Sequence, residues 1–188
     1  MANVYEECPV LENERWRLHL IEKSDAEDLL NVYSDKNALP FFNSDNCDGD
    51  NFYYPTKEQM DKAIDFWLYS YREKWFVRWV IIDKTVSKAI GTVELFHRPD
   101  NGDFGEVGVL RLDVGSAYER SGLLNSLFAL ILPPAYELFD CDRIISKIPV
   151  YAVERIDAAE KYGFTKSEQY LIGKGDYAYN DYWIVSRS

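Results

Sequence analysis

The stretch FVRWVIIDKTVSKAIGTVELFHRPDNGDFGEVGVLRLDV, residues 76–114, decides the fold. Apolar residues dominate three runs within it, which predicts strands over Phe76–Asp83, Ala89–His97 and Phe104–Val114. The Asn-Gly pair in Pro99-Asp-Asn-Gly102 favours a tight hairpin turn, because both residues tolerate positive φ. We therefore expect the three strands to form an antiparallel meander.

The residues before the meander predict a strand and two helices. Ser24 with Glu27, and Thr56 with Gln59, have the spacing of a capping box, in which two side chains satisfy free amides at a helix start. Residues 35–55 lack periodicity and predict an exposed acidic loop. The predicted elements are a strand over Arg15–Ile21 and helices over Asp25–Ser34 and from Thr56 to about Lys74.

Helix and strand patterns alternate after the meander. Ser121 is placed to cap a helix beginning near Gly122, and Pro133-Pro134 predicts a kink in it or two short helices. Gly163 is expected just past the end of the next helix. The remaining predicted elements are a strand over Arg143–Ile148, a helix over Val153–Tyr162, and closing strands over Phe164–Ile172 and Tyr177–Val185. The order predicts one α/β (α+β) domain over residues 1–188, with a mixed, mostly antiparallel central sheet flanked by helices.

Composition narrows the classes of partner. The net charge of −11 argues against nucleic acid and against an anionic membrane surface, which both need a basic face. It permits a cationic acceptor such as an amine, although acidic charge also simply keeps proteins soluble. The high aromatic fraction of 15% predicts a packed core or, less favoured, a ligand groove with aromatic walls.

The cysteines and the N-terminal residues favour a cytoplasmic protein. Three widely spaced cysteines fit free thiols in a reducing compartment better than a disulfide framework. Two histidines are too few for a histidine-rich metal site, so we expect no metal. The N-terminal residues lack the pattern of a signal peptide, and the uncharged run Ser121–Tyr136 is too short for a membrane span.

Three local motifs, in this order of elements, resemble the GNAT superfamily of N-acetyltransferases. Gly105-Glu-Val-Gly108 resembles the A-E-I-G that opens a cleft strand there, and Tyr118-Glu-Arg-Ser-Gly122 lies where the family has its pyrophosphate loop. Glu160-Lys-Tyr-Gly-Phe164 is similar to the E-K-x-G-F of the branch containing the ribosomal-protein N-terminal acetyltransferases. The resemblance covers Arg15 to the C-terminus.

The resemblance implies acetyl-CoA as cosubstrate, without a metal. In the family the strands corresponding to 104–114 and 143–148 splay apart, the pantetheine arm lies in the gap, and backbone amides at the next helix N-terminus hold the pyrophosphate. The reaction implied is direct attack of a primary amine, from a small molecule or a peptide or protein N-terminus, on the thioester. The cofactor-binding residues implied are Leu112, Val114, Arg120, Ser121, Gly122, Leu123 and Leu124.

The chain departs from the family at four positions. The family loop reads Q/R-x-x-G-x-G/A, whereas Glu119 and Leu124 stand at its first and last positions here. Ala152 falls where an Asn is frequent, and Ala159 where many members have the Tyr that protonates the departing thiolate. These departures leave open two alternatives. One is a non-catalytic protein of this fold that binds CoA, another ligand or a protein partner, and the other is an interaction protein with an empty or collapsed cleft.

Carboxylates on the cleft strands are the candidate general bases. Glu106 is first because it matches the Glu of the family motif, Glu94 on the neighbouring strand is second, and Asp113 is third. Each is alternatively a solvated carboxylate or an ion-pair partner. Tyr162 or Tyr151 is a candidate acid for the thiolate, or else an aromatic of the core or rim.

The sequence pattern says least about the acceptor and the oligomeric state. We expect the acceptor to be read by the first two helices and the loop Asn37–Pro55. An antiparallel edge strand at the C-terminus would allow a homodimer.

Overall fold

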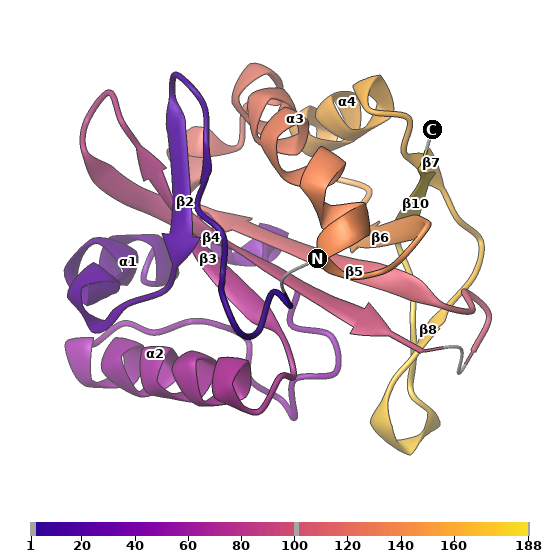
Figure 1. Ribbon diagram of the computed structural model, residues 1–188, viewed down its shortest axis with the longest axis horizontal. Helices are drawn as coiled ribbons and strands as arrows, with labels where there is room; N and C mark the ends of the chain where they lie inside the picture. Colours follow the sequence, from indigo (N-terminus) through magenta and orange to yellow (C-terminus); the bar gives the residue numbers. More distant parts are fainter. Residues whose placement is uncertain (1–2, 100–101, 188) are drawn as a thin grey trace.

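The computed structural model describes residues 3–99 and 102–187, in which helices cover both faces of a central sheet (Figure 1). The pair α1 and α2 covers one face, and α3 and α4 cover the other. The strands are β1 (Leu11–Glu12), β2 (Trp16–Leu20), β3 (Val77–Asp83), β4 (Lys88–Arg98), β5 (Val107–Val114), β6 (Arg143–Lys147), β7 (Thr165–Lys166), β8 (Leu171–Ile172), β9 (Ala178–Tyr179) and β10 (Tyr182–Ser186). The α-helices are α1 (Ala26–Tyr33), α2 (Lys57–Arg72), α3 (Ser121–Leu138) and α4 (Val153–Lys161).

The main sheet has the order β1-β2-β3-β4-β5-β6-β10-β7, and β8 and β9 form a separate ribbon. Every pairing in the main sheet is antiparallel except β5 with β6. That parallel pairing joins only Gly108–Leu110 to Ile144–Ser146, so β5 runs on to Val114 without β6 beside it. The predicted mixed, mostly antiparallel sheet is confirmed, and it opens where β5 and β6 diverge.

The continuous apolar runs of the meander arise because both faces of β3, β4 and β5 are buried. Side chains alternate between the faces, so Trp79 packs on the α3 side while Val80 packs against α1 and α2. The α1–α2 side also buries charge, including Arg78, Glu94 and Asp113. These charged residues make this face the polar half of the interior.

Helix boundaries test the predicted caps. Thr56 caps α2, with its Oγ1 accepting from the Gln59 amide at 3.3 Å, as predicted. The second half of that box differs, because the Gln59 side chain accepts from the Thr56 hydroxyl at 2.9 Å and not from the Thr56 amide. The predicted Ser24–Glu27 box is wrong, because a 3₁₀ turn over Lys23–Asp25 precedes α1 and Asp25 accepts from the Glu22 amide at 2.8 Å. The capping box at this turn therefore begins at Glu22, two residues before the predicted Ser24.

Helix α3 differs from its prediction in two ways. Arg120 occupies the N-cap position and Ser121 is the first helical residue, so Ser121 is not the cap. The helix continues through Pro133 and Pro134, so of the two predicted alternatives the division into two short helices is wrong, and the kink stays a prediction. Leu132 and Ala135 on either side of the prolines are buried against the sheet, and this packing offsets the lost backbone bonds.

The closing strands are shorter than predicted. Each predicted run is divided in two, because the residues between them fold back as the β8–β9 ribbon, with a 3₁₀ turn at Lys174–Asp176. Asp181 has φ of +62°, a backbone conformation that interrupts a strand. The last strand, β10, lies between β6 and β7, so the expectation of a free C-terminal edge is wrong. The homodimer itself stays a prediction.

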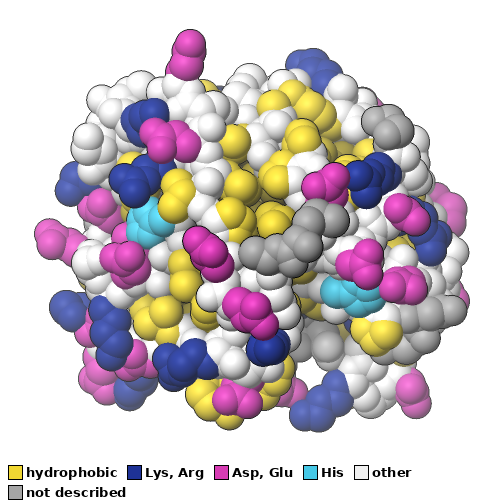
Figure 2. All heavy atoms as spheres, in the orientation of Figure 1, with side chains coloured by type: hydrophobic (Ala, Val, Ile, Leu, Met, Phe, Trp, Pro, Cys, Tyr) yellow, Lys and Arg dark blue, Asp and Glu magenta, His cyan; other side chains and the backbone are white. Residues whose placement is uncertain are grey.

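The surface and the loops add three observations. On the face shown in Figure 2, acidic and basic side chains are interspersed rather than gathered by sign. Among the residues that the structure describes, no helix is long and apolar enough to cross a membrane. The predicted Asn-Gly turn over Pro99–Gly102 includes Asp100 and Asn101, which lie outside the described residues.

Two glycines provide a matched test of the packing between β4 and β5. A Cβ on Gly91 would lie 2.1 Å from the Asp113 carbonyl oxygen and 2.8 Å from the Val114 Cα, whereas a Cβ on Gly122 would meet no atom of the described residues within 4 Å. We expect Gly91→Ala to lower the free energy of unfolding by about 3 kcal/mol, because backbone atoms cannot yield. Gly122→Ala should raise it by up to ~1 kcal/mol, since Ala is the better helix former. Urea denaturation checks both, and equal stability of the two variants would contradict this packing.

Candidate functional site

The gap between β5 and β6 is filled by an arginine of the chain itself. Among the described residues, none pairs as a strand with β5 on the β6 side beyond Leu110. The Leu112 carbonyl there accepts a hydrogen bond from Nη1 of Arg155 at 2.7 Å. Arg155 comes from the first turns of α4 and is 2% exposed. A guanidinium therefore lies where the resemblance implies a pantetheine arm.

Glu119 is the charge partner of Arg155. Its carboxylate accepts from Nη2 and, at 3.2 Å, from Nε of Arg155. Both side chains are buried, and Nη1 of Arg155 also approaches the Phe41 carbonyl at 3.4 Å. The pair thus ties α4 to β5, to the loop before α3 and to the 3₁₀ turn over Leu39–Phe41. Glu119, which departs from the family's pyrophosphate loop, therefore has its negative charge balanced by Arg155 inside the protein.

The N-terminus of α3 is also occupied from within. The Ser121 amide donates to Oε2 of Glu154 at 2.6 Å, and the Ser121 hydroxyl donates to Asp157. Both carboxylates come from α4, and they interact favourably with the positive end of the α3 dipole. A diphosphate at this helix end would meet the carboxylate of Glu154 and that of Asp157, which is paired with Lys161 at 2.7 Å.

The structure brings the predicted cofactor-binding residues together at the gap and the start of α3. The amides of Leu123 and Leu124 both donate to the Arg120 carbonyl, so they already have partners. Arg120 is exposed and Gly122 faces open space. The side chains of Leu112, Val114 and Leu124 are buried in the core on the α3 side. Their role in holding a cofactor stays a prediction.

A pocket of about 360 Å³ opens on the other face of the sheet, between α2, the loop 46–52 and strands β3 to β5. Six aromatic rings line it, and three charged side chains form its floor. The lining residues are Asn46, Cys47, Asp48, Asp50, Phe52, Phe66, Trp67, Trp75, Phe76, Arg78, Glu94, Phe96 and Arg111. Sequence reasoning found Glu94 and the loop, but it did not gather the aromatic side chains into one wall.

Glu94 lies between two arginines on the pocket floor. Oε1 accepts from Arg111 Nη1 at 2.7 Å and Oε2 accepts from Arg78 Nη2, with Glu94 and Arg78 both 1% exposed. Burial alone would raise the pKa of Glu94, but the two guanidiniums outweigh it and lower the pKa. A carboxylate held in its charged form by two cations is a weak proton acceptor near neutral pH.

Asp113 lies deeper on the same face. Its Oδ2 accepts from the Tyr33 hydroxyl at 3.0 Å and from Arg78 Nη1 at 3.3 Å. Burial raises the pKa of Asp113 despite the nearby Arg78. Asp113 therefore favours its neutral form more than an exposed aspartate does.

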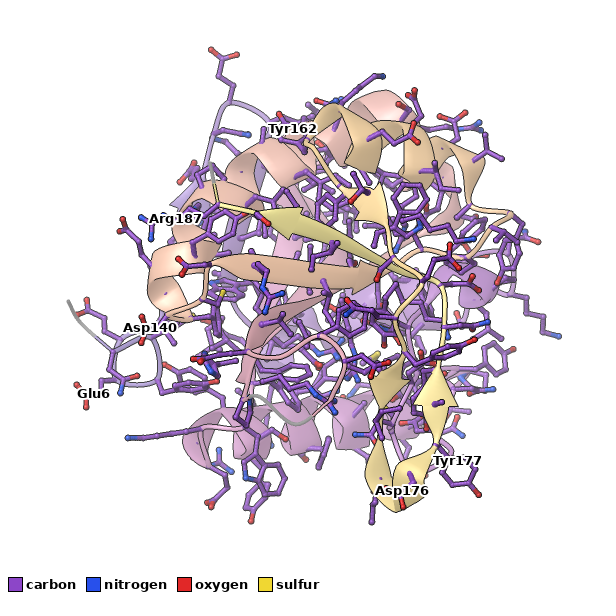
Figure 3. All side chains as sticks on the ribbon, turned by 90° about the vertical axis from the view of Figure 1, so that its right-hand side faces the viewer. Glu6, Asp140, Tyr162, Asp176, Tyr177 and Arg187 are labelled. Carbon is purple, nitrogen blue, oxygen red and sulfur yellow. The ribbon has the colours of Figure 1, made fainter. Side chains whose placement is uncertain are left out.

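The other predicted catalytic side chains lie apart from this pocket. Glu106 precedes β5, is 60% exposed and lies 3.1 Å from Nε2 of His97. Five residue-to-residue steps of extended strand, about 17 Å, separate it from Arg111. Tyr162 ends α4, packs on Phe128, and lies near α3 and α4 in Figure 3, while Tyr151 donates to the Pro40 carbonyl at 2.5 Å. The structure does not bring these groups together.

The remaining predictions concern cysteines, metals and α4. Cys8, Cys47 and Cys141 are free. In residues 3–99 and 102–187, no group of three or more His, Cys, Asp or Glu side chains is arranged to hold a metal ion. Ala152 and Ala159 are buried, so neither position of α4 offers the polar group found in the family.

Comparison with known proteins identifies the fold and the family. The sequence model of the acetyltransferase (GNAT) domain matches residues 15–165. No curated protein sequence matches the chain. Solved structures with a similar fold include a GNAT-family acetyltransferase from Bacillus anthracis, with a TM-score of 0.67 and 15% identity over 95% of this chain and 98% of that one.

Two further structures have named substrates. A ribosomal-protein-S5-alanine acetyltransferase from Vibrio fischeri has a TM-score of 0.67 and 20% identity over 95% of this chain and 96% of that one. A spermidine N-acetyltransferase from Vibrio cholerae, solved with CoA and spermine, has a TM-score of 0.66 and 15% identity over 93% and 97%. The matches support acyl transfer as the general activity of proteins with this domain.

The Arg155–Glu119 pair can be tested through stability. We expect Arg155→Met to lower the free energy of unfolding by about 3 kcal/mol, because it leaves Glu119 buried without its counter-charge. The double variant Glu119→Leu/Arg155→Met should recover most of that loss, since apolar side chains of similar volume replace buried pairs well. Chemical denaturation measures both effects.

Lys62→Met is the control, because it breaks the exposed pair with Glu58 and should change stability by less than ~0.5 kcal/mol. Wild-type stability of Arg155→Met would show that the guanidinium is not held in the gap.

Proposed function

The chain belongs to the acetyltransferase (GNAT) domain family, and within it we propose a ligand-binding member whose CoA channel is closed by its own side chains. The observation that carries the proposal is the Arg155 guanidinium in the gap between β5 and β6. A pantetheine arm in that gap would compete with Arg155 for the Leu112 carbonyl. It would also have to separate a buried ion pair, which costs several kcal/mol unless both charges find new partners.

The start of α3 supports the same conclusion. Helix N-termini bind phosphate because their amides are free and their dipole is positive. Here Glu154 and Asp157 already bond Ser121 at that end. Binding of a diphosphate would require these carboxylates to withdraw, since like charges repel at such short range.

Of the groups that acyl transfer needs, the base in the pocket is poor and the acid on α4 is missing. Glu94 has a lowered pKa and is a poor base, and Ala159 cannot protonate a thiolate. What the pocket does offer is a cavity of about 360 Å³ with aromatic walls and a charged floor, which suits a small molecule. We therefore assign the ligand to this pocket.

N-acetyl transfer from acetyl-CoA to a primary amine is the second candidate. The divergence of β5 and β6 favours it, because that geometry leaves β5 backbone groups available once Arg155 moves away. The acceptor would be a small-molecule amine or a peptide N-terminus, as for the spermidine and ribosomal-protein enzymes of similar fold. Glu106, Glu94 or Asp113 would then act as base and Tyr162 as acid.

Calorimetric titration with CoA and acetyl-CoA separates the two candidates. We expect no binding to the wild-type protein at ligand concentrations up to about 1 mM. The variant Glu119→Gln/Arg155→Ala should gain measurable CoA affinity, because it removes both the guanidinium and the buried negative charge from the channel.

A melting curve controls for folding of the double variant. Micromolar binding of CoA to the wild type would contradict the closed channel. Release of free thiol from acetyl-CoA in the presence of amines would establish the second candidate instead.

A further inference from the structure

The mouth of the pocket exposes aromatic rings. Phe66 on α2 and Trp75 after it are each 52% exposed, their ring centroids lie 6.4 Å apart, and both line the cavity. Large rings left in water at the entrance of a cavity mark a binding site. Their spacing and the cavity volume suit a ligand with one planar ring system.

The floor carries more positive than negative charge. Two guanidiniums, of Arg78 and Arg111, share the single carboxylate of Glu94. The next acid along the sheet, Asp113, bonds Arg78 at 3.3 Å, and its raised pKa disfavours the charged form. The polar end of a ligand at this floor would therefore be favoured if it were negative.

Arg111 has unused hydrogen-bonding capacity. Its Nη1 donates to Glu94 and its Nη2 to the Asp45 carbonyl, both at 2.7 Å. A guanidinium has five N–H groups, so three remain. Over residues 3–99 and 102–187, Nε of Arg111 is buried without a hydrogen-bond partner. A carboxylate beside Arg111 would satisfy such donors and balance the charge.

A cationic ligand would be disfavoured, because the chain's own cations already lie over the aromatic faces. The Arg78 guanidinium lies 4.1 Å from the Trp67 ring centroid and 5.5 Å from that of Phe52. Arg111 lies 5.5 Å from the centroid of Phe96. A second cation would be repelled by these guanidiniums at the rings of Trp67, Phe52 and Phe96.

The acids at the rim have partners of their own. Asp48 forms an ion pair with Lys174 at 3.3 Å. Asp50 accepts from the Tyr54 hydroxyl at 2.6 Å and from the Phe52 amide at 2.8 Å. Lys174 offsets the charge of Asp48, and the two hydrogen bonds to Asp50 order the loop that forms one wall.

We propose that this pocket binds a small aromatic carboxylate, with its ring against Phe66 and Trp75 and its carboxylate at Arg111. The inference rests on the proposed function in placing the ligand in this pocket, but it does not depend on whether CoA binds. The ligand class follows from the charge of the floor, and the ring follows from the exposed aromatic mouth.

Three probes with the same indole ring test the charge. Indole-3-propionate carries a carboxylate, tryptamine an ammonium, and L-tryptophan both. We expect calorimetry to give indole-3-propionate a dissociation constant below about 1 mM and an affinity at least about tenfold above that of tryptamine. Equal or tighter binding of tryptamine would overturn the proposal, as would no binding of indole-3-propionate to folded protein.

Two variants locate the bound probe. Trp75→Ala should weaken indole-3-propionate about fivefold, whereas Tyr170→Ala, which removes a similarly exposed ring (48%) outside the pocket lining, should leave affinity unchanged. Arg111→Lys keeps the charge but loses the planar fork, and should weaken the carboxylate probes about tenfold. Unchanged affinity in Trp75→Ala would overturn the placement even if the Arg111 variant fails to fold.

A parallel CoA titration separates this inference from the proposed function. Binding of CoA with retained indole-3-propionate binding would refute the closed channel alone. Absence of both would leave the channel closed and refute the ligand class.

Discussion

The buried ion pair between Arg155 and Glu119 is the constraint on which the rest of the structure depends. One guanidinium bonds Glu119 in the loop before α3, the Leu112 carbonyl on β5 and the Phe41 carbonyl in the turn after α1. A charge removed so far from water is tolerable only with its counter-charge and with its remaining donors satisfied. The pair therefore fixes α4 over the gap and holds three otherwise separate segments around it.

The sheet divides the interior of the protein into an apolar half and a polar half. On the α3 side the core is apolar. On the α1–α2 side, alternate positions of three neighbouring strands align Arg78, Thr92, Glu94, Arg111 and Asp113 in one network. The Tyr33 hydroxyl joins that network, and burial raises its pKa well above the ordinary value, so it remains a neutral donor. Such a network is rigid, and it gives the pocket a floor of fixed charge.

The sequence predicted the meander and the α/β order because apolar periodicity and caps are local properties. It did not predict the division of the closing strands, since the positive φ of Asp181 leaves no local pattern. The resemblance marked Glu119 as a misfit, but its partner Arg155 lies 36 positions away, and no local rule connects the two. Glu106 was preferred to Glu94 because it matches the Glu of the family motif at the start of β5. That motif does not show how far along β5 the gap to β6 opens.

The pocket and the closed gap meet at two consecutive residues of β5. The Arg111 side chain lies on the pocket floor, while the Leu112 carbonyl, one residue on, bonds Arg155 in the gap. In an acyltransferase this adjacency would bring acceptor and thioester together. Here it brings a third guanidinium close to the polar network, and Arg155 lowers the pKa of Asp113 against the larger effect of burial. Arg155, together with its counter-charge Glu119, therefore connects the gap to the polar network of the pocket floor through β5.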